Sequence, residues 1–182
     1  SLRDIYDGSR SDFYFNYLKK KEKLIDIKKS KVLIVGPRNE GEIYNFYANG
    51  FLIQNITAID LVSYSNKIIA SDANIYLKKC KKKFDYIYFG FVIGYFKNPK
   101  KIISLAAKCL NKNGCVVVCS EAARKINNLR RVEKTAKFHD LKSLSNIFPK
   151  NLKTLYKSKY TEKLYFFKSE FIKCFLIIKK NS

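Results

Sequence analysis

The sequence has no methionine or tryptophan, a single histidine, and only 3 prolines and 7 glycines among its 182 residues. This scarcity of glycine and proline excludes a collagen-like fibre and a proline-rich linker. No apolar run reaches the ~18–20 residues of a membrane-spanning helix, because lysine or arginine interrupts each one. The N-terminus also lacks the basic-then-apolar pattern of a signal peptide. We therefore expect a cytoplasmic protein with no membrane partner, and the missing methionine leaves open that the chain is part of a longer protein.

Cysteine is present, but the 5 cysteines are odd in number and no two of them form a CxxC pair. This pattern is unlike that of a disulfide scaffold or a zinc site. It predicts reduced, buried thiols and no metal site. The cysteines are Cys80, Cys109, Cys115, Cys119 and Cys174.

Acidic residues are also scarce, with 15 Asp and Glu against 37 Lys and Arg, which gives a net charge of +22. A field of this sign attracts the phosphates of nucleic acid, anionic lipid or a phosphorylated small substrate. The richness in Lys, Ile, Asn, Tyr and Phe is equally typical of a biased coding sequence. Both explanations of the charge remain open at this stage.

What the chain does contain is an ordinary globular composition, with 47% hydrophobic and 29% charged residues, enough for one domain with a real core. Short, fully apolar segments alternate with segments of helical periodicity. The predicted strands are residues 31–36, 56–61, 67–71, 84–89, 115–120, 152–157 and 170–179. The predicted helices are residues 11–27, 42–49, 73–79, 98–110 and 141–148.

This alternation predicts an α/β fold, a doubly wound, seven-stranded mixed sheet with helices on both faces. The link over 158–169 is too short for a helical crossover and suits a hairpin. We therefore expect the last strand to run antiparallel to its neighbours.

Five segments in order resemble the class I S-adenosylmethionine (SAM)-dependent methyltransferases, a Rossmann-like family, and in particular its type 11 members. The segment 32–42, which reads VLIVG followed by PRNEGE, resembles the first strand and its glycine loop. Residues 58–61 (AIDL) and 71–73 (SDA) resemble the ends of the second and third strands. Residues 84–99 and 110–114 resemble the fourth strand, the helix that follows and the next turn. The resemblance implies one domain over 1–182, made of an N-terminal helical extension (1–30), a cofactor-binding core (31–121) and a C-terminal helix and strand pair (122–182).

The implied cofactor is SAM, bound at the carboxyl ends of the strands. Gly36 and the following helix would offer free backbone amides there. Asp60, at the end of a strand, is placed to accept both ribose hydroxyls, although a turn-forming aspartate is the alternative. Leu61 and Phe89 could sandwich the adenine ring.

By the same resemblance, Asp72 would receive the adenine amino group and the amide of Ala73 would reach a ring nitrogen. Asp72 also precedes a helical segment, so a helix N-cap is an equal alternative.

The glycine loop departs from the family pattern. Arg38 and Glu40 occupy the positions of the second and third glycines, and Ile34 replaces the acid common inside the first strand. Arg38 could instead face the cofactor's carboxylate, and Glu40 or Glu42 could supply the missing negative charge. The alternative is a solvated first helical turn, where acids are favoured by the helix dipole.

The acceptor side of the site offers few signals. Tyr95, in the loop 90–96 after the fourth strand, is a weak catalytic candidate that could orient an acceptor, and packing is the alternative. His139, the single histidine, has nothing that places it near the pocket.

No Asn-Pro-Pro-Tyr-type motif for base methylation follows the fourth strand. We expect a methyltransferase acting on a hydroxyl or amine of a small molecule or glycan. The alternative is a non-catalytic module that binds an acidic partner such as RNA through its basic surface. The basic segment 124–131 could follow a phosphate backbone, with a solvated helix face as the favoured alternative, and nucleic acid is not the favoured partner.

Overall fold

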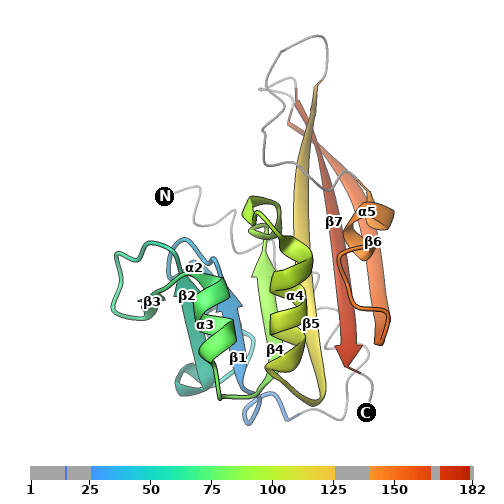
Figure 1. Ribbon diagram of the computed structural model, residues 1–182. Helices are drawn as coiled ribbons and strands as arrows, with labels where there is room; N and C mark the ends of the chain where they lie inside the picture. Colours follow the sequence, from blue (N-terminus) through green and yellow to red (C-terminus); the bar gives the residue numbers. More distant parts are fainter. Residues whose placement is uncertain (1–14, 16–25, 126–139, 165–168, 181–182) are drawn as a thin grey trace.

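Seven strands form one mixed sheet in the described part of the chain (Figure 1). The computed structural model describes residue 15 and residues 26–125, 140–164 and 169–180. The strands are β1 (Val32–Val35), β2 (Ile56–Asp60), β3 (Ile68–Ala70), β4 (Phe84–Gly90), β5 (Leu110–Lys125), β6 (Leu152–Leu164) and β7 (Ser169–Lys180).

The helices of the described residues are α2 (Gly41–Ala48), α3 (Ala73–Lys79), α4 (Pro99–Lys108) and α5 (Leu141–Ser145), with short 3₁₀ turns η1 (Ile53–Asn55) and η2 (Ile93–Tyr95). The start of α4 follows from local chemistry. Pro99 occupies its first turn, and the side chain of Asn98 accepts a hydrogen bond from the amide of Lys101 at 3.0 Å. The amides of the first helical turn have no backbone partner within the helix. Proline has no amide hydrogen to satisfy, and the asparagine side chain satisfies the amide of Lys101.

The strand order is β3-β2-β1-β4-β5-β7-β6. The first five strands are parallel, whereas β7 runs antiparallel to both β5 and β6. The predicted mixed sheet, its antiparallel last strand and the terminal hairpin are therefore confirmed. The chain order reverses between β1 and β4, which is the kind of switch point where open α/β sheets bind ligands.

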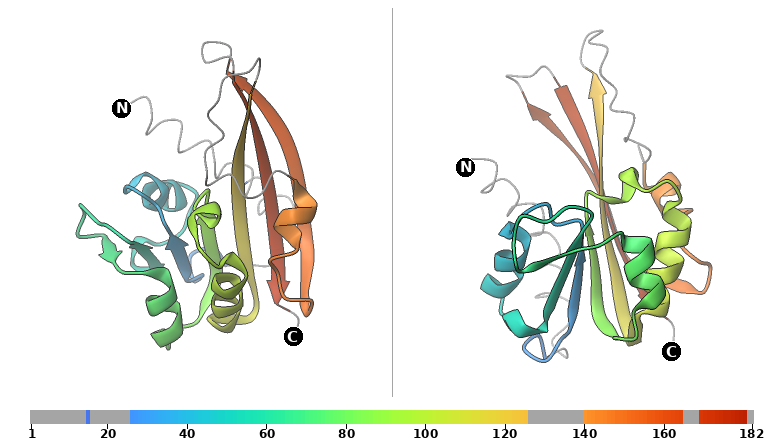
Figure 2. Two further views of the ribbon diagram at one scale, coloured as in Figure 1. Left: turned by 45° about the horizontal axis from the view of Figure 1, so that its top comes forward. Right: turned by 60° about the vertical axis from the view of Figure 1, so that its left-hand side comes forward.

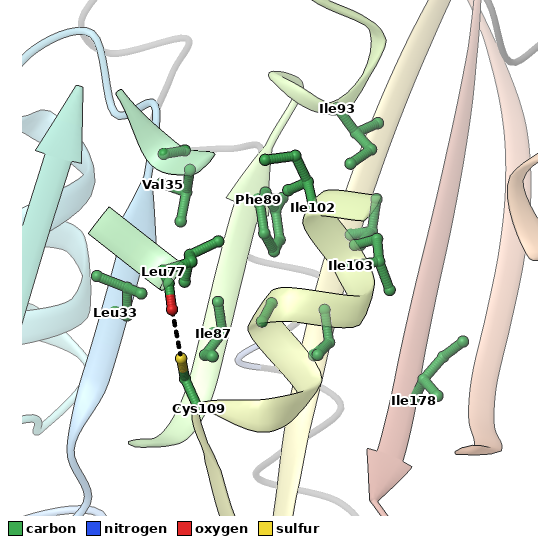
Figure 3. Close-up of a cluster of buried hydrophobic side chains, with 14 of the residues drawn as sticks. Leu33, Val35, Leu77, Ile87, Phe89, Ile93, Ile102, Ile103, Cys109 and Ile178 are labelled. Carbon is green, nitrogen blue, oxygen red and sulfur yellow. Dashed lines mark hydrogen bonds between the residues drawn. The ribbon is translucent and has the colours of Figure 1, made fainter. Parts of the chain in front are cut away.

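Helices cover both faces of the sheet, as predicted, with α2 on one face and α3, α4 and α5 on the other (Figure 2). Strand alternation divides the core accordingly. Val32, Ile34 and Tyr88 pack with Phe46 of α2, and Phe15 joins this cluster. Leu33, Val35, Ile87 and Phe89 pack toward α3 and α4 on the opposite face (Figure 3).

Several elements differ in length from the prediction. β5 begins at Leu110, where a turn was predicted, because Leu110 pairs with Phe84 before a register shift. Beyond Cys119, the last β5 residue that pairs with β4, the strand continues to Lys125 because β7 supplies backbone partners. β6 and β7 lengthen for the same reason, and these three strands extend past the end of β4 (Figure 1).

Two helical predictions are also corrected. α4 ends at Lys108, two residues early, and α5 ends at Ser145 rather than 148. Most of the predicted helix 11–27, His139, and residues 126–131 of the basic segment lie outside the described residues.

Candidate functional site

A cleft of about 730 Å³ opens at the carboxyl ends of β1, β2 and β4. Its walls come from the loop after β1, the starts of α2 and α3, and residues 90–92 and 95–97 after β4. This is the edge of the sheet where the strand order reverses. The volume lies within the ~300–1,000 Å³ typical of small-molecule sites.

The loop after β1 is held in a conformation that favours glycine. Gly36 has φ +72°, and a Cβ added there would lie 2.5 Å from the Cγ2 of Val92. Its amide donates to the carbonyl of Ile59 at 2.8 Å. The expectation that this amide is free for a ligand is therefore wrong, and glycine is needed here for its shape.

Arg38 also adopts a left-handed conformation, with φ +55°. The loop thus keeps the backbone path that a second glycine would take, although a non-glycine residue there costs roughly 1–2 kcal/mol. The exposed Arg38 side chain lines the cleft. Its amide donates to the Oδ2 atom of Asp60 at 3.0 Å.

Asp60 ends β2 and lines the cleft, as predicted. Its carbonyl accepts the amide of Ser71 at 2.7 Å, so its backbone is tied to the end of β3. One carboxylate oxygen holds the loop through Arg38, and the side chain still contributes to the cleft surface.

Asp72 and Ala73 line the cleft at the start of α3. The Oδ1 atom of Asp72 accepts the amides of Asn74 at 2.7 Å and Ile75 at 3.2 Å. Asp72 is therefore the N-cap of α3, and the alternative drawn from the sequence is confirmed. As the N-cap, Asp72 still lines the cleft.

The two glutamates of this segment, Glu40 and Glu42, differ in position: only Glu42 lines the cleft. Glu40 lies outside the cleft lining, where it accepts the hydroxyl of Ser65 and pairs with Lys67 at 3.0 Å. Hydrogen bonds from Ser65 and Tyr44, together with Lys67, lower the pKa of Glu40 to about 2. Glu40 was expected to bind the cofactor and to supply negative charge in the cleft. Both expectations are wrong, because Glu40 does not line the cleft.

Glu42, in contrast to Glu40, lines the cleft. It lies in the first turn of α2 and is only 6% exposed. A Cβ on Gly90 would collide with its Oε1 atom, so the glycine that ends β4 makes room for the carboxylate. Glu42 lies eight positions after Ile34, which occupies the place of the family's usual acid. No local sequence pattern indicates that the Glu42 carboxylate lies beside Gly90 in the cleft.

Leu61 and Phe89, which were predicted to sandwich the adenine ring, do not lie in the same site. Leu61 is 69% exposed and lines the cleft. Phe89 is fully buried against the α4 side, with its ring 6.3 Å from that of Phe96 (Figure 3). Its predicted place in the cleft is wrong, because strand alternation turns it into the core. Phe91, two residues later, lines the cleft instead.

Tyr95 stands at the lip of the cleft and is 66% exposed. It belongs to η2, whose Ile93 is fully buried and anchors the turn. The amide of Tyr95 donates to the carbonyl of Val92 at 3.0 Å. The ring of Tyr95 is therefore not packed in the core, so the packing role proposed as the alternative from the sequence is wrong.

A family profile described as a methyltransferase domain matches residues 10–167. The chain belongs to the methyltransferase domain family. A search of curated proteins finds no significant match to this sequence.

Solved structures share the fold of this methyltransferase domain at low identity. The crystal structure of MccD protein is 14% identical, with a TM-score of 0.63, over 93% of this chain and 97% of that one. NodS from Bradyrhizobium japonicum, an N-methyltransferase in complex with S-adenosyl-L-homocysteine (SAH), is 14% identical with a TM-score of 0.59, over 84% and 79%. TehB from Haemophilus influenzae is 15% identical with a TM-score of 0.63, over 91% and 62%. The fold is that of a class I, Rossmann-like methyltransferase.

The cleft of this methyltransferase domain concentrates acidic side chains. Glu42, Asp60 and Asp72 line it together, although the whole chain has only 15 acids against 37 basic residues. Exposed Arg38 and Lys97 supply the cationic side chains of the lining.

Within the described ranges, no group of three or more His, Cys, Asp or Glu side chains could hold a metal ion. No helix in that part of the chain is long and apolar enough to cross a membrane.

Proposed function

We propose that this methyltransferase domain binds SAM in the cleft and methylates a hydroxyl or amine of a small molecule or glycan. The observation that carries the proposal is the convergence of Glu42, Asp60 and Asp72 on one cleft at the sheet's switch point. SAM carries a sulfonium and an ammonium, and a cleft rich in carboxylates suits such a cation inside an otherwise repelling +22 field.

The nucleoside half has the better-formed subsite. Asp60 would accept the ribose hydroxyls, and the start of α3 would meet the adenine edge through Asp72 and Ala73. Leu61 and Phe91 offer apolar surface for the base. Asp60 and Asp72 each already hold backbone amides, which fixes their carboxylates before the ligand arrives.

The methionine half depends on replacements. Glu42 is a buried carboxylate next to Gly90, and it fits the ammonium that the missing acid at Ile34 would otherwise hold. Charge-assisted hydrogen bonds of this kind are among the stronger ones. Arg38, in the cleft lining, would face the donor's carboxylate.

When bound, SAM supplies a methyl group made electrophilic by its sulfonium. The protein's part is chiefly to hold the acceptor in line with that group, since proximity and orientation supply much of such a barrier reduction. Tyr95, exposed at the lip, would position the acceptor through its phenol. Phe91 and Phe96 would exclude water beside it.

A small acceptor is favoured because the cleft volume of about 730 Å³ must hold both donor and acceptor. RNA remains the second candidate because the net charge is +22. The exposed lysines of the surface would then bind phosphates without specifying sequence.

The acceptor class is tested with methyl-labelled SAM, a panel of hydroxyl- and amine-bearing small molecules and glycans, and a mixed RNA pool. The expected result is label in the small-molecule or glycan fraction, reduced in Tyr95→Phe and unchanged in Tyr64→Phe, a tyrosine outside the cleft lining that is 96% exposed. Label found in RNA alone would overturn the small-acceptor proposal.

A further inference from the structure

The C-terminal ends of α3 and α4 lie side by side, and each ends on a cysteine. Cys80 is the C-cap residue of α3 and Cys109 is that of α4. Cys109 is buried, with its Sγ 3.5 Å from the carbonyl oxygen of Leu77 (Figure 3). Cys80 is half-buried, with its Sγ 3.6 Å from the carbonyl oxygen of Lys82.

Both cysteines line the same groove, both are free thiols, and they lie close enough for Cys80 to affect the pKa of Cys109. Burial and the neighbouring Cys80 thiol raise the pKa of Cys109, while Lys83 opposes that rise. Tyr76 lies against the same pair; burial and Cys80 raise its pKa to about 12, so its phenol stays protonated at neutral pH.

A groove of about 530 Å³ between the two helices gives access to the pair. Both cysteines line it, and none of the described residues adds an acidic side chain to the lining. The Nζ of Lys83 donates to the carbonyl of Lys108 at 2.6 Å, which joins the two segments that carry the cysteines. The lysines in the groove lining are Lys78, Lys83, Lys101 and Lys108.

We propose that Cys80 and Cys109 are a redox pair, which forms a disulfide by exchange with an anionic low-molecular-weight disulfide drawn into the lysine-lined groove. The half-buried Cys80 thiolate attacks one sulfur of that disulfide, forms a mixed disulfide and releases one thiolate. Cys109 then loses its proton and attacks the Cys80 sulfur, which releases the second thiolate. The two protein thiols are oxidised, the small disulfide is reduced to two thiols, and the protons pass to those products.

The bond would link α3 and α4, which lie on the same face of the sheet. One of them, α3, opens at Asp72 and Ala73 in the wall of the cleft. Oxidation would therefore join α4 to the far end of the helix that begins in this part of the cleft wall. The proposal does not depend on methyl transfer.

The experiment treats the reduced protein with oxidised glutathione, which is anionic, and in parallel with cystamine, which is cationic. Remaining thiols are then alkylated and the protein is digested with chymotrypsin, which separates Cys80 (residues 78–84) from Cys109 (residues 106–110). The expected product joins these two peptides with the loss of two hydrogen atoms, and it forms faster with glutathione than with cystamine. Closing this loop should raise the melting temperature by roughly 5–15 °C.

Cys80→Ser should abolish the cross-link and leave Cys109 open to alkylation after unfolding, whereas Cys115→Ser should retain the cross-link. Because Cys80 is only half-buried, this variant is expected to fold even if a Cys109 variant does not. Glutathione that remains on Cys80 while Cys109 stays reduced would overturn the proposal. So would a cross-link to any other cysteine, or exchange with cystamine that is as fast as with glutathione.

Discussion

The Oδ2 atom of Asp60 accepts a hydrogen bond from the backbone amide of Arg38 at 3.0 Å, which joins the end of β2 to the loop after β1. This contact fixes a loop that has lost its second glycine but keeps the left-handed backbone there. It also holds the carboxylate of Asp60 at the cleft surface. The same residue thus stabilises the loop and is placed for ligand binding.

Asp60→Asn tests these two roles separately. The amide oxygen of asparagine can still accept from Arg38, so folding should change little, while a charged hydrogen bond to the ligand is lost. We expect adenosine and SAH to bind about 1–3 kcal/mol more weakly, as measured by isothermal titration calorimetry. Asp85→Asn is the control for a carboxylate outside the cleft: at the opposite end of the sheet, Asp85 accepts the amide of Lys31 at 2.8 Å and the side-chain amide of Asn111 at 2.7 Å. Equal losses of affinity in both variants would contradict a ribose role for Asp60.

Glu42→Gln tests the methionine half. Removing the buried charge should weaken SAH binding about ten- to hundredfold, since a charge-assisted hydrogen bond is worth about 1.5–3 kcal/mol. Adenosine, which lacks the ammonium, should bind both proteins alike. Glu40→Gln, two residues away and outside the cleft lining, should leave both affinities unchanged. If Glu42→Gln weakens adenosine as much as SAH, the carboxylate is structural.

Gly36→Ala should destabilise the fold, by about 1–3 kcal/mol in urea denaturation, for two separable reasons. Alanine is strained at φ +72°, and its Cβ would press on the side chain of Val92. Adding Val92→Ala to Gly36→Ala should recover the contact part but not the backbone part. Full recovery in the double variant would show that the backbone conformation carries no cost.

Glu40 gives the stability a pH dependence. Its pKa in the folded protein is about 2, below its ordinary value of 4.5, so the carboxylate stabilises the folded state above pH 4.5. That stabilisation is lost as the pH falls from 4.5 toward 2. The free energy of unfolding of the wild type should therefore exceed that of Glu40→Gln at neutral pH and converge with it in acid. A difference that persists unchanged at low pH would contradict this assignment.

The sheet could be predicted from the sequence because each central strand is a short, fully apolar run, as in the VLIV of β1. Such runs are typical of strands buried on both faces. The far ends of β5 and β7 could not be predicted in this way. Their pairing from Ser120 to Lys125 depends on backbone partners supplied by a distant segment, not on the local pattern.

The residues of the candidate site likewise fall into those that the local sequence marks and those that depend on distant segments. Asp60, Leu61 and Asp72 could be placed because they end strands or begin a helix, positions that local sequence marks. Phe89 was misplaced because both faces of β4 carry buried side chains, so the local sequence does not mark which face Phe89 takes. Glu42 could be named only as an alternative to Glu40, since its approach to Gly90 brings together segments that only the folded sheet joins.

The central claim, that the cleft binds SAM mainly through its nucleoside half, is tested most directly by a thermal-shift titration with SAM, SAH and adenosine. A ligand at about 100 times its dissociation constant stabilises a fold by roughly 2.7 kcal/mol, which for this length is a melting shift of roughly 5–11 °C. The account predicts such a shift with SAM and SAH, a large part of it with adenosine, and a smaller shift with each ligand in Asp60→Asn. No shift with any of the three ligands up to millimolar concentration would contradict the account and favour a methyltransferase-like binding module.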